Sequence, residues 1–212
     1  MKELVIHELD ERLQKQVQQA RDALTKGGVE YVLQVCVELL NKHPSAYEVR
    51  ELLWEALRST LPESSTLAGR LRNKSDGFQF RFSTRSLLKK DPLELIYRCD
   101  EMLLRKQLFP DLFLALEKAG SALGWVENQA LACRVLIELE PEQCTHRLSL
   151  AKILLDAKRP LEAIEHLEWT LAKEPTNGEA QTLLKNASVA ETLQRGNWED
   201  TTTNFHSKTK DV

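Results

Sequence analysis

The sequence predicts an all-α fold, and three observations support this prediction. Leucine contributes 37 of the 212 residues, whereas isoleucine and valine together contribute 16, and β-branched residues are the ones that favour strands. Glycine and proline, which interrupt helices, contribute only 8 and 7 residues. Apolar residues also recur at the three- and four-residue intervals of an amphipathic helix over most of the chain. We therefore expect helices packed on helices.

The helical segments are separated by recognisable boundary residues. Breaks are expected at Gly27-Gly28, at Gly124 and at Arg159-Pro160, because glycine and proline interrupt helical hydrogen bonding. Three helix starts are expected from residues that can cap a free amide. They are a capping box at Ser45-Ala46-Tyr47-Glu48, Asp91 followed by Pro92, and Asn177.

Charge, cysteine and the first residues indicate the broad class of the protein. The net charge is −3, and no apolar run approaches the roughly 18 residues that a membrane span requires. The four cysteines lie among apolar residues without CxxC spacing, which predicts buried thiols rather than disulfides or a zinc site. The start of the chain mixes acids and bases and lacks the apolar core of a secretory signal. We expect a soluble cytoplasmic protein.

Residues of one type recur every 34 positions in the second half of the chain. This interval separates Leu116 from Leu150 and Leu184, Lys118 from Lys152 and Asn186, and Pro141 from Pro175. A period of 34 is typical of a helix-turn-helix unit. In the clearest unit, residues 147–175, small residues occupy the positions where two helices would meet, and larger apolar residues surround them. The small residues are Ala151 and Ala163, and the larger ones are Leu150, Leu154 and Leu167.

This pattern resembles the tetratricopeptide repeat (TPR) family, including bacterial TPR proteins of undefined role. The resemblance implies an α-solenoid of helix-turn-helix units with an interrupting basic loop, and a role in protein-protein interaction. The expected segments are TPR-like helices over 1–60, a basic insertion rich in serine and phenylalanine over 61–90, TPR-like units with a closing helix over 91–194, and a polar tail over 195–212. We expect the tail to be disordered because it is polar and aperiodic.

The repeat also predicts where a partner would bind. Lys118, Lys152 and Asn186 each follow a core leucine by two residues, and a rotation of about 200° turns each side chain away from that leucine. The resemblance implies that these positions, together with Arg21 in an earlier unit, face the concave groove that TPR proteins use. Such a groove could hold an acidic extended peptide. The alternative is that these side chains form an ordinary solvated stripe.

The basic insertion offers a second candidate site. Eight cations and two acids lie between Arg58 and Lys90. In an extended strand, Phe78, Phe80 and Phe82 would project from one side, and aromatic rings among cations can bind RNA or another anion. The cations chosen for this role are Arg70, Arg72, Lys74, Arg81 and Arg85. The alternative is that the phenylalanines pack the loop back onto the helices while the cations stay solvated.

Motifs of enzymes and cofactor sites are missing from the sequence. It contains no GxGxxG, GxxxxGK[ST], GxSxG or HExxH pattern, which are the usual signatures of nucleotide, nucleophile and zinc sites. Glu162, Glu165 and His166 are the best metal-like group, but a solvated helix face explains them equally well. We expect a non-enzymatic scaffold or adaptor without cofactor or metal, with a protein partner and no indication of which protein it is.

Overall fold

The helical prediction is confirmed by the computed structural model, which describes residues 2–60 and 74–207 and places side chains at 2–60, 80 and 83–195. The structure is 81% helical and has no strand within the described ranges. One isolated parallel bridge, between Leu4 and Ala46, occurs among these residues. The chain divides into two compact units, residues 1–142 and 143–212.

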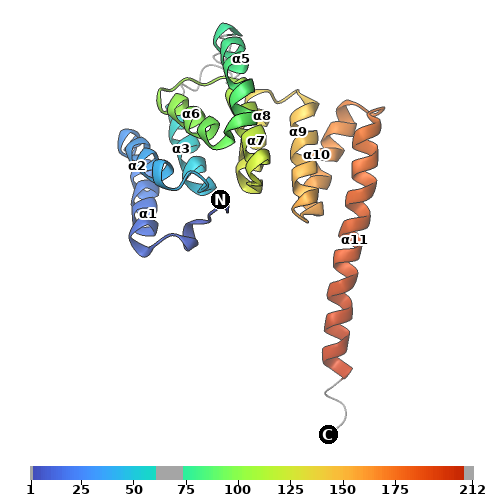
Figure 1. The fold of residues 1–212 in the computed structure, drawn as a ribbon. Helices are drawn as coiled ribbons and strands as arrows, with labels where there is room; N and C mark the ends of the chain where they lie inside the picture. The colour runs from blue at the N-terminus through green and yellow to red at the C-terminus, as the bar shows by residue number, and fades with distance from the viewer. Residues whose placement is uncertain (1, 61–73, 208–212) are drawn as a thin grey trace. The chain divides into compact units, whose positions relative to one another are not determined.

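Unit 1 consists of a short 3-10 turn and seven described helices that pack largely against their chain neighbours (Figure 1). The elements are η1 (Ile6–Glu8), α1 (Glu11–Thr25), α2 (Val29–Lys42), α3 (Tyr47–Ser59), α5 (Lys74–Lys90), α6 (Pro92–Leu104), α7 (Pro110–Leu123) and α8 (Val126–Leu139). One apolar core runs through the unit, and Trp54 of α3 meets Phe113 of α7 in it, with ring centroids 5.3 Å apart.

Unit 2 is a helix pair covered by a third helix: α9 (Cys144–Asp156), α10 (Pro160–Lys173) and α11 (Gly178–Ser207). Helix α10 packs against both α9 and α11. Leu150, Leu154, Ala151 and Ala163 are at most 1% exposed, as the register of the repeat predicts. The packing of α9 against α10 therefore follows the small-residue positions read from the sequence.

The 34-residue period reappears in the positions of the helices. Helices α7, α9 and α11 begin at Pro110, Cys144 and Gly178, and α8 and α10 begin at Val126 and Pro160. Each start therefore follows the corresponding earlier one by 34 residues.

Most of the predicted boundaries are confirmed. Gly27 and Gly124 have φ angles of 79° and 70°, which is the left-handed region that glycine adopts at helix ends without strain. The Asp91 side chain accepts from the Glu94 amide at 3.0 Å, and Asn177 accepts from the Ala180 amide at 3.0 Å. Both residues therefore cap their helices as expected.

The predicted capping box at Ser45 is wrong. Helix α3 has Ala46 as its N-cap, without a side-chain cap bond, and the buried Ser45 hydroxyl has no hydrogen-bond partner among the described residues. The Glu48 carboxylate accepts instead from the amide of Ile6. A tertiary contact thus takes the group that the local motif would have used.

The expected interrupting loop is also wrong over residues 74–90, which form helix α5. Phe80 is 5% exposed and meets Phe109 edge-on, with ring centroids 5.3 Å apart. Phe80 and Thr84 are buried, while Leu87 and Leu88 are partly buried against the core, and their spacing is that of one helix face. Packing on α6 and α7 thus outweighs the low intrinsic propensity of the Ser- and Gly-containing segment. Residues 61–73 lie outside the described residues.

The last helix continues beyond its expected end near residue 194, and α11 reaches Ser207. No proline occurs between Gly178 and Ser207, so no residue there lacks the amide that a helix needs.

Candidate functional site

The predicted groove residues are exposed, as a binding stripe requires. Lys118 on α7 and Lys152 on α9 are exposed, two residues after Leu116 and Leu150, which are 3% and 1% exposed. Arg21 on α1 is exposed as well. The repeat register thus assigns buried and exposed positions correctly in these helices.

Lys152 and Asn186 lie in unit 2, where the surroundings of the stripe residues are less regular. Asn186 on α11 is exposed, but Leu184, its expected core neighbour, is only half-buried. Lys152 is already paired, because its Nζ lies 2.7 Å from the Glu179 carboxylate on α11. Both partners remain about half exposed, so a competing anion displaces this pair at little cost. Arg21 and Lys118 belong to unit 1, and Lys152 and Asn186 belong to unit 2.

A face of mixed charge surrounds Arg21 in unit 1. Burial raises the pKa of Glu51 on α3, while Arg134 on α8 and Arg21 on α1 act in the opposite direction. Glu55 adds a further negative charge close to Glu51. This face therefore presents both donors and acceptors, the combination that a polar peptide backbone needs.

Of the five cations chosen as an anion site, only Arg85 has a described side chain. It is exposed on α5, as are its neighbours Lys89 and Lys90. Arg70 and Arg72 lie outside the described residues, and Lys74 and Arg81 lie in α5 without described side chains. Phe80 is buried in the core, as the alternative of phenylalanines packing onto the helices predicts, so its ring is not available for base stacking. The side chains of Phe78 and Phe82 are not described.

A buried polar network, which the sequence analysis missed, joins three helices of unit 1. The guanidinium of Arg50 (α3) binds both carboxylate oxygens of Asp100 (α6) at 2.8 and 2.7 Å. It also donates to the Asn128 side chain (α8) and, at 2.8 Å, to the Pro44 carbonyl. All three residues are at most 5% exposed. Burial lowers the pKa of Arg50, but the charge and hydrogen bonds of Asp100 outweigh burial and raise it, so the guanidinium stays charged.

The network extends to the beginning of the chain through Glu3. The Glu3 carboxylate accepts from the Asn128 amide at 2.7 Å, from its Nδ2 at 2.6 Å and from the Glu127 amide at 2.9 Å. These two amides belong to the first turn of α8, whose N–H groups have no acceptor within the helix. A carboxylate is the group that such a helix end favours.

Unit 2 holds a smaller cluster around Trp169. The guanidinium carbon of Arg147 lies 4.0 Å, and Nζ of Lys173 5.5 Å, from the centroid of the Trp169 ring. Arg147 also contacts His166 Nδ1 at 3.4 Å. Cation-π contacts of this kind stabilise packing, so the half-buried ring is engaged within its own unit.

The predicted metal-like group does not assemble into a site. Glu162 accepts from Arg159 Nε at 2.6 Å, and His166 meets Arg147. In the part of the chain that the structure describes, no group of three potential metal ligands occurs. Within the same ranges, no helix is long and apolar enough to cross a membrane.

The four cysteines are free and buried, as predicted. Burial raises the pKa of Cys36 and of Cys133 to about 12. Because the thiolate is the reactive form, these thiols are inert in the folded chain.

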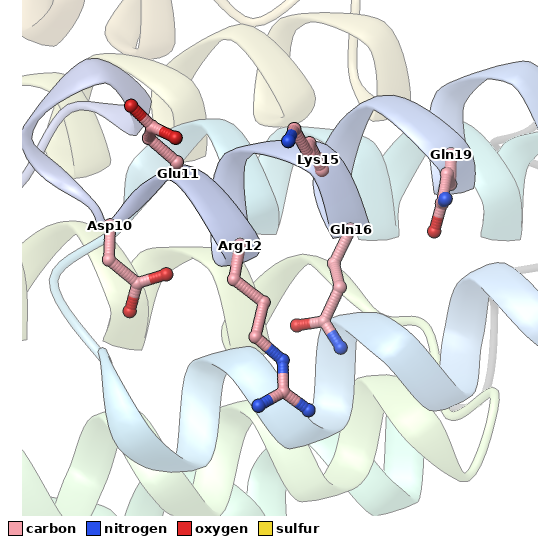
Figure 2. A pocket seen from close by; sticks show the side chains of 6 residues that line it. All are labelled: Asp10, Glu11, Arg12, Lys15, Gln16 and Gln19. Carbon is pink, nitrogen blue, oxygen red and sulfur yellow. The ribbon is translucent and has the colours of Figure 1, made fainter.

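A polar depression lies on the surface of α1 (Figure 2). It is lined by Asp10, Glu11, Arg12, Lys15, Gln16 and Gln19. Figure 2 shows all six side chains projecting from this one helix and its N-cap, with Arg12 and Gln16 on the same side. The Asp10 carboxylate already caps α1 by accepting from the Leu13 amide at 2.9 Å, so no built ligand site results.

Comparisons with protein-family models, with curated protein sequences and with solved structures found no match to this chain.

Proposed function

We propose that the protein is a non-enzymatic scaffold or adaptor that holds a partner segment along a TPR-like array. The observation that carries the proposal is the 34-residue recurrence of helix starts, combined with a buried leucine and an exposed lysine two residues later in α7 and α9. Stacked helix pairs of this kind form an extended surface on which side chains set the choice of partner. The mixed charges around Arg21 and Glu51 suit a polar extended segment.

The partner segment is acidic in this proposal, because Arg21 and Lys118 supply exposed cations on unit 1, and Lys152 and Asn186 supply an exposed cation and an amide on unit 2. The four buried free thiols support a reducing compartment such as the cytoplasm.

The test begins with purification of the tagged chain from its own cell and identification of the proteins bound to it. Binding of the partner so found is then measured for the wild type and for Lys118→Glu/Lys152→Glu. We expect the variant to bind at least about tenfold more weakly, since two attractive contacts become repulsive. Lys42→Glu/Lys185→Glu is the matched control, because it makes the same change of charge at exposed lysines outside the stripe, one in each unit. Equal weakening by both double variants would contradict the groove.

A second candidate function is binding of RNA or another polyanion through the basic residues 58–90. The observation in its favour is the exposed trio Arg85, Lys89 and Lys90 at the end of α5. Binding of single-stranded RNA should then fall steeply with salt, and Arg85→Glu/Lys89→Glu should abolish it. RNA binding that changes neither with salt nor with these two substitutions would refute this function.

A further inference from the structure

Residues 2–9, called segment 2–9 below, form the first part of unit 1 and lie against its helices. The amide of Leu4 donates to the Ser45 carbonyl at 3.4 Å, and the Glu3 carboxylate binds the first turn of α8. Ile6 packs partly buried against the core, and Leu9 is 7% exposed. The segment thus combines a charged anchor, a main-chain hydrogen bond and one aliphatic anchor on the core, Ile6.

The residues that segment 2–9 contacts are held in place by one another and not by the segment. Asn128 is 3% exposed, its side-chain oxygen accepts from Arg50, and its Nδ2 donates to the Ser45 carbonyl at 3.1 Å. Asp100 in turn fixes the Arg50 guanidinium. Asn128 is therefore oriented for a carboxylate by Arg50 on α3, which Asp100 on α6 fixes, and by the Ser45 carbonyl before α3, and this orientation does not need Glu3.

Ser45, whose carbonyl takes part in this contact, also has a side chain without a hydrogen bond within the described ranges. The Ser45 hydroxyl is 0% exposed and has no hydrogen-bond partner among the described residues, although the carbonyl of the same residue accepts from both Leu4 and Asn128. A buried polar group without a partner is rare. Segment 2–9 therefore leaves one buried polar group of Ser45 without a hydrogen bond.

Segment 2–9 is held mainly by hydrogen bonds. Besides the bonds of Glu3 and Leu4, the Ile6 amide donates to the Glu48 carboxylate, and Gln14 Nε2 donates to the carbonyls of His7 and Leu9 at 3.2 and 2.7 Å. The pairing of segment 2–9 with residues 45 and 46 consists of one bridge, and η1 contains no buried residue. Segments with few buried contacts open locally at a small fraction of the free energy of global unfolding. Opening would leave the amides of Glu127 and Asn128 and the Asn128 Nδ2 ready for another carboxylate.

We propose that this place is a docking site for an extended acidic segment of a partner protein, and that segment 2–9 is an internal ligand which the partner displaces. The partner segment carries a carboxylate at one position and an aliphatic side chain three residues later, in the pattern of Glu3 and Ile6. This site uses none of the stripe residues, so its test can fail while the proposed groove is correct, and the reverse.

The probe is a fluorescently labelled peptide with the sequence of residues 1–10, and its binding to the full-length chain is followed by anisotropy. Glu3→Ala removes the charged anchor of the internal ligand, so this variant should bind the probe about tenfold or more tightly than the wild type. A probe with alanine in place of its own glutamate at position 3 should bind the variant about tenfold or more weakly. Glu8→Ala is the matched control, because Glu8 lies in the same segment and bonds only within it, to Lys2 and to the amide of Val5.

Equal affinity of the wild type and Glu3→Ala for the probe, or binding that ignores the glutamate of the probe, would overturn the proposal. If Glu3→Ala fails to fold, amide hydrogen exchange of the wild type tests instead whether segment 2–9 opens locally. The amides of Leu4, Glu127 and Asn128 should then exchange at least about a hundredfold faster than those of Leu131 and Val135 in the same helix. Exchange of all these amides only through global unfolding would show that segment 2–9 is not displaceable.

Discussion

Replacement of Arg50 by methionine tests the buried network most directly. The guanidinium makes four hydrogen bonds to buried groups, two of them to the Asp100 carboxylate. Methionine fills a similar volume without charge, so Arg50→Met leaves Asp100, which is 5% exposed, as an unpaired buried carboxylate. The expected loss of stability therefore arises mainly from the unpaired charge of Asp100 rather than from a cavity.

The size of this loss of stability follows from the burial of the ion pair between Arg50 and Asp100. Removal of one partner of a buried ion pair destabilises a protein by about 3–5 kcal/mol, and each kcal/mol lowers the Tm of a chain of this size by about 2–4 °C. We therefore expect the Tm of unit 1 to fall by roughly 6–20 °C. Arg50→Met/Asp100→Leu removes both charges and should recover most of the loss, since apolar replacements of whole buried pairs are often neutral or stabilising.

The assay is urea unfolding followed by circular dichroism, with Arg58→Met as the control. Arg58 lies on the same helix and pairs with Glu138 at 3.6 Å, but its side chain is 58% exposed, so its loss should cost less than about 1 kcal/mol. A cost below about 1 kcal/mol for Arg50→Met, or a double variant no more stable than the single one, would refute the reasoning.

Four further predictions concern the packing. Ser45→Ala should not lower the free energy of unfolding, because it removes a buried hydroxyl without a partner among the described residues, whereas loss of a capping serine would cost about 1 kcal/mol; urea unfolding distinguishes the two. Ala163→Leu should overpack the contact between α9 and α10 and cost about 1–3 kcal/mol, and an unchanged melting curve would contradict the assigned register. Phe80→Ala should cost about 3–5 kcal/mol by the same measurement, and a surface-like effect would contradict its burial against Phe109. Because burial raises the pKa of Cys36 and Cys133 to about 12, alkylation of both by iodoacetamide at pH 8 should require unfolding, and rapid labelling of the native chain would contradict this.

Features that depend on neighbouring residues were predictable from the sequence. The left-handed glycines at positions 27 and 124 and the caps at Asp91 and Asn177 are set by groups within four residues of the helix end. The 34-residue register likewise predicted the burial of Leu150 and Ala163, since both lie on a strongly periodic pair of helices.

Features that depend on distant partners were not predictable in the same way. Ser45 and Glu48 have the form of a capping box, but the Ile6 amide, 42 residues away from Glu48, takes the carboxylate. Helix α5 was predicted as a loop because its propensity is low, and its packing partner Phe109 lies beyond the next helix. The spacing of Phe80, Thr84 and Leu87 along one helix face is the signal that could have revealed this helix.

The sequence contains a signal of the buried network, but it can be recognised only when α3 and α6 are compared with each other. Arg50 lies among Val49, Leu53 and Leu57 on the buried stripe of α3, and Asp100 lies four residues after Ile96 and three before Leu103 on that of α6. A charge within an apolar stripe is costly unless an opposite charge meets it, so two such charges of opposite sign predict each other. The partners are 50 residues apart and Asn128 is 78 residues from Arg50, which removes any local spacing from the pattern. It follows that the docking site at α8 is specified by core positions rather than by a surface motif, and that its carboxylate preference can be changed only together with the packing of unit 1.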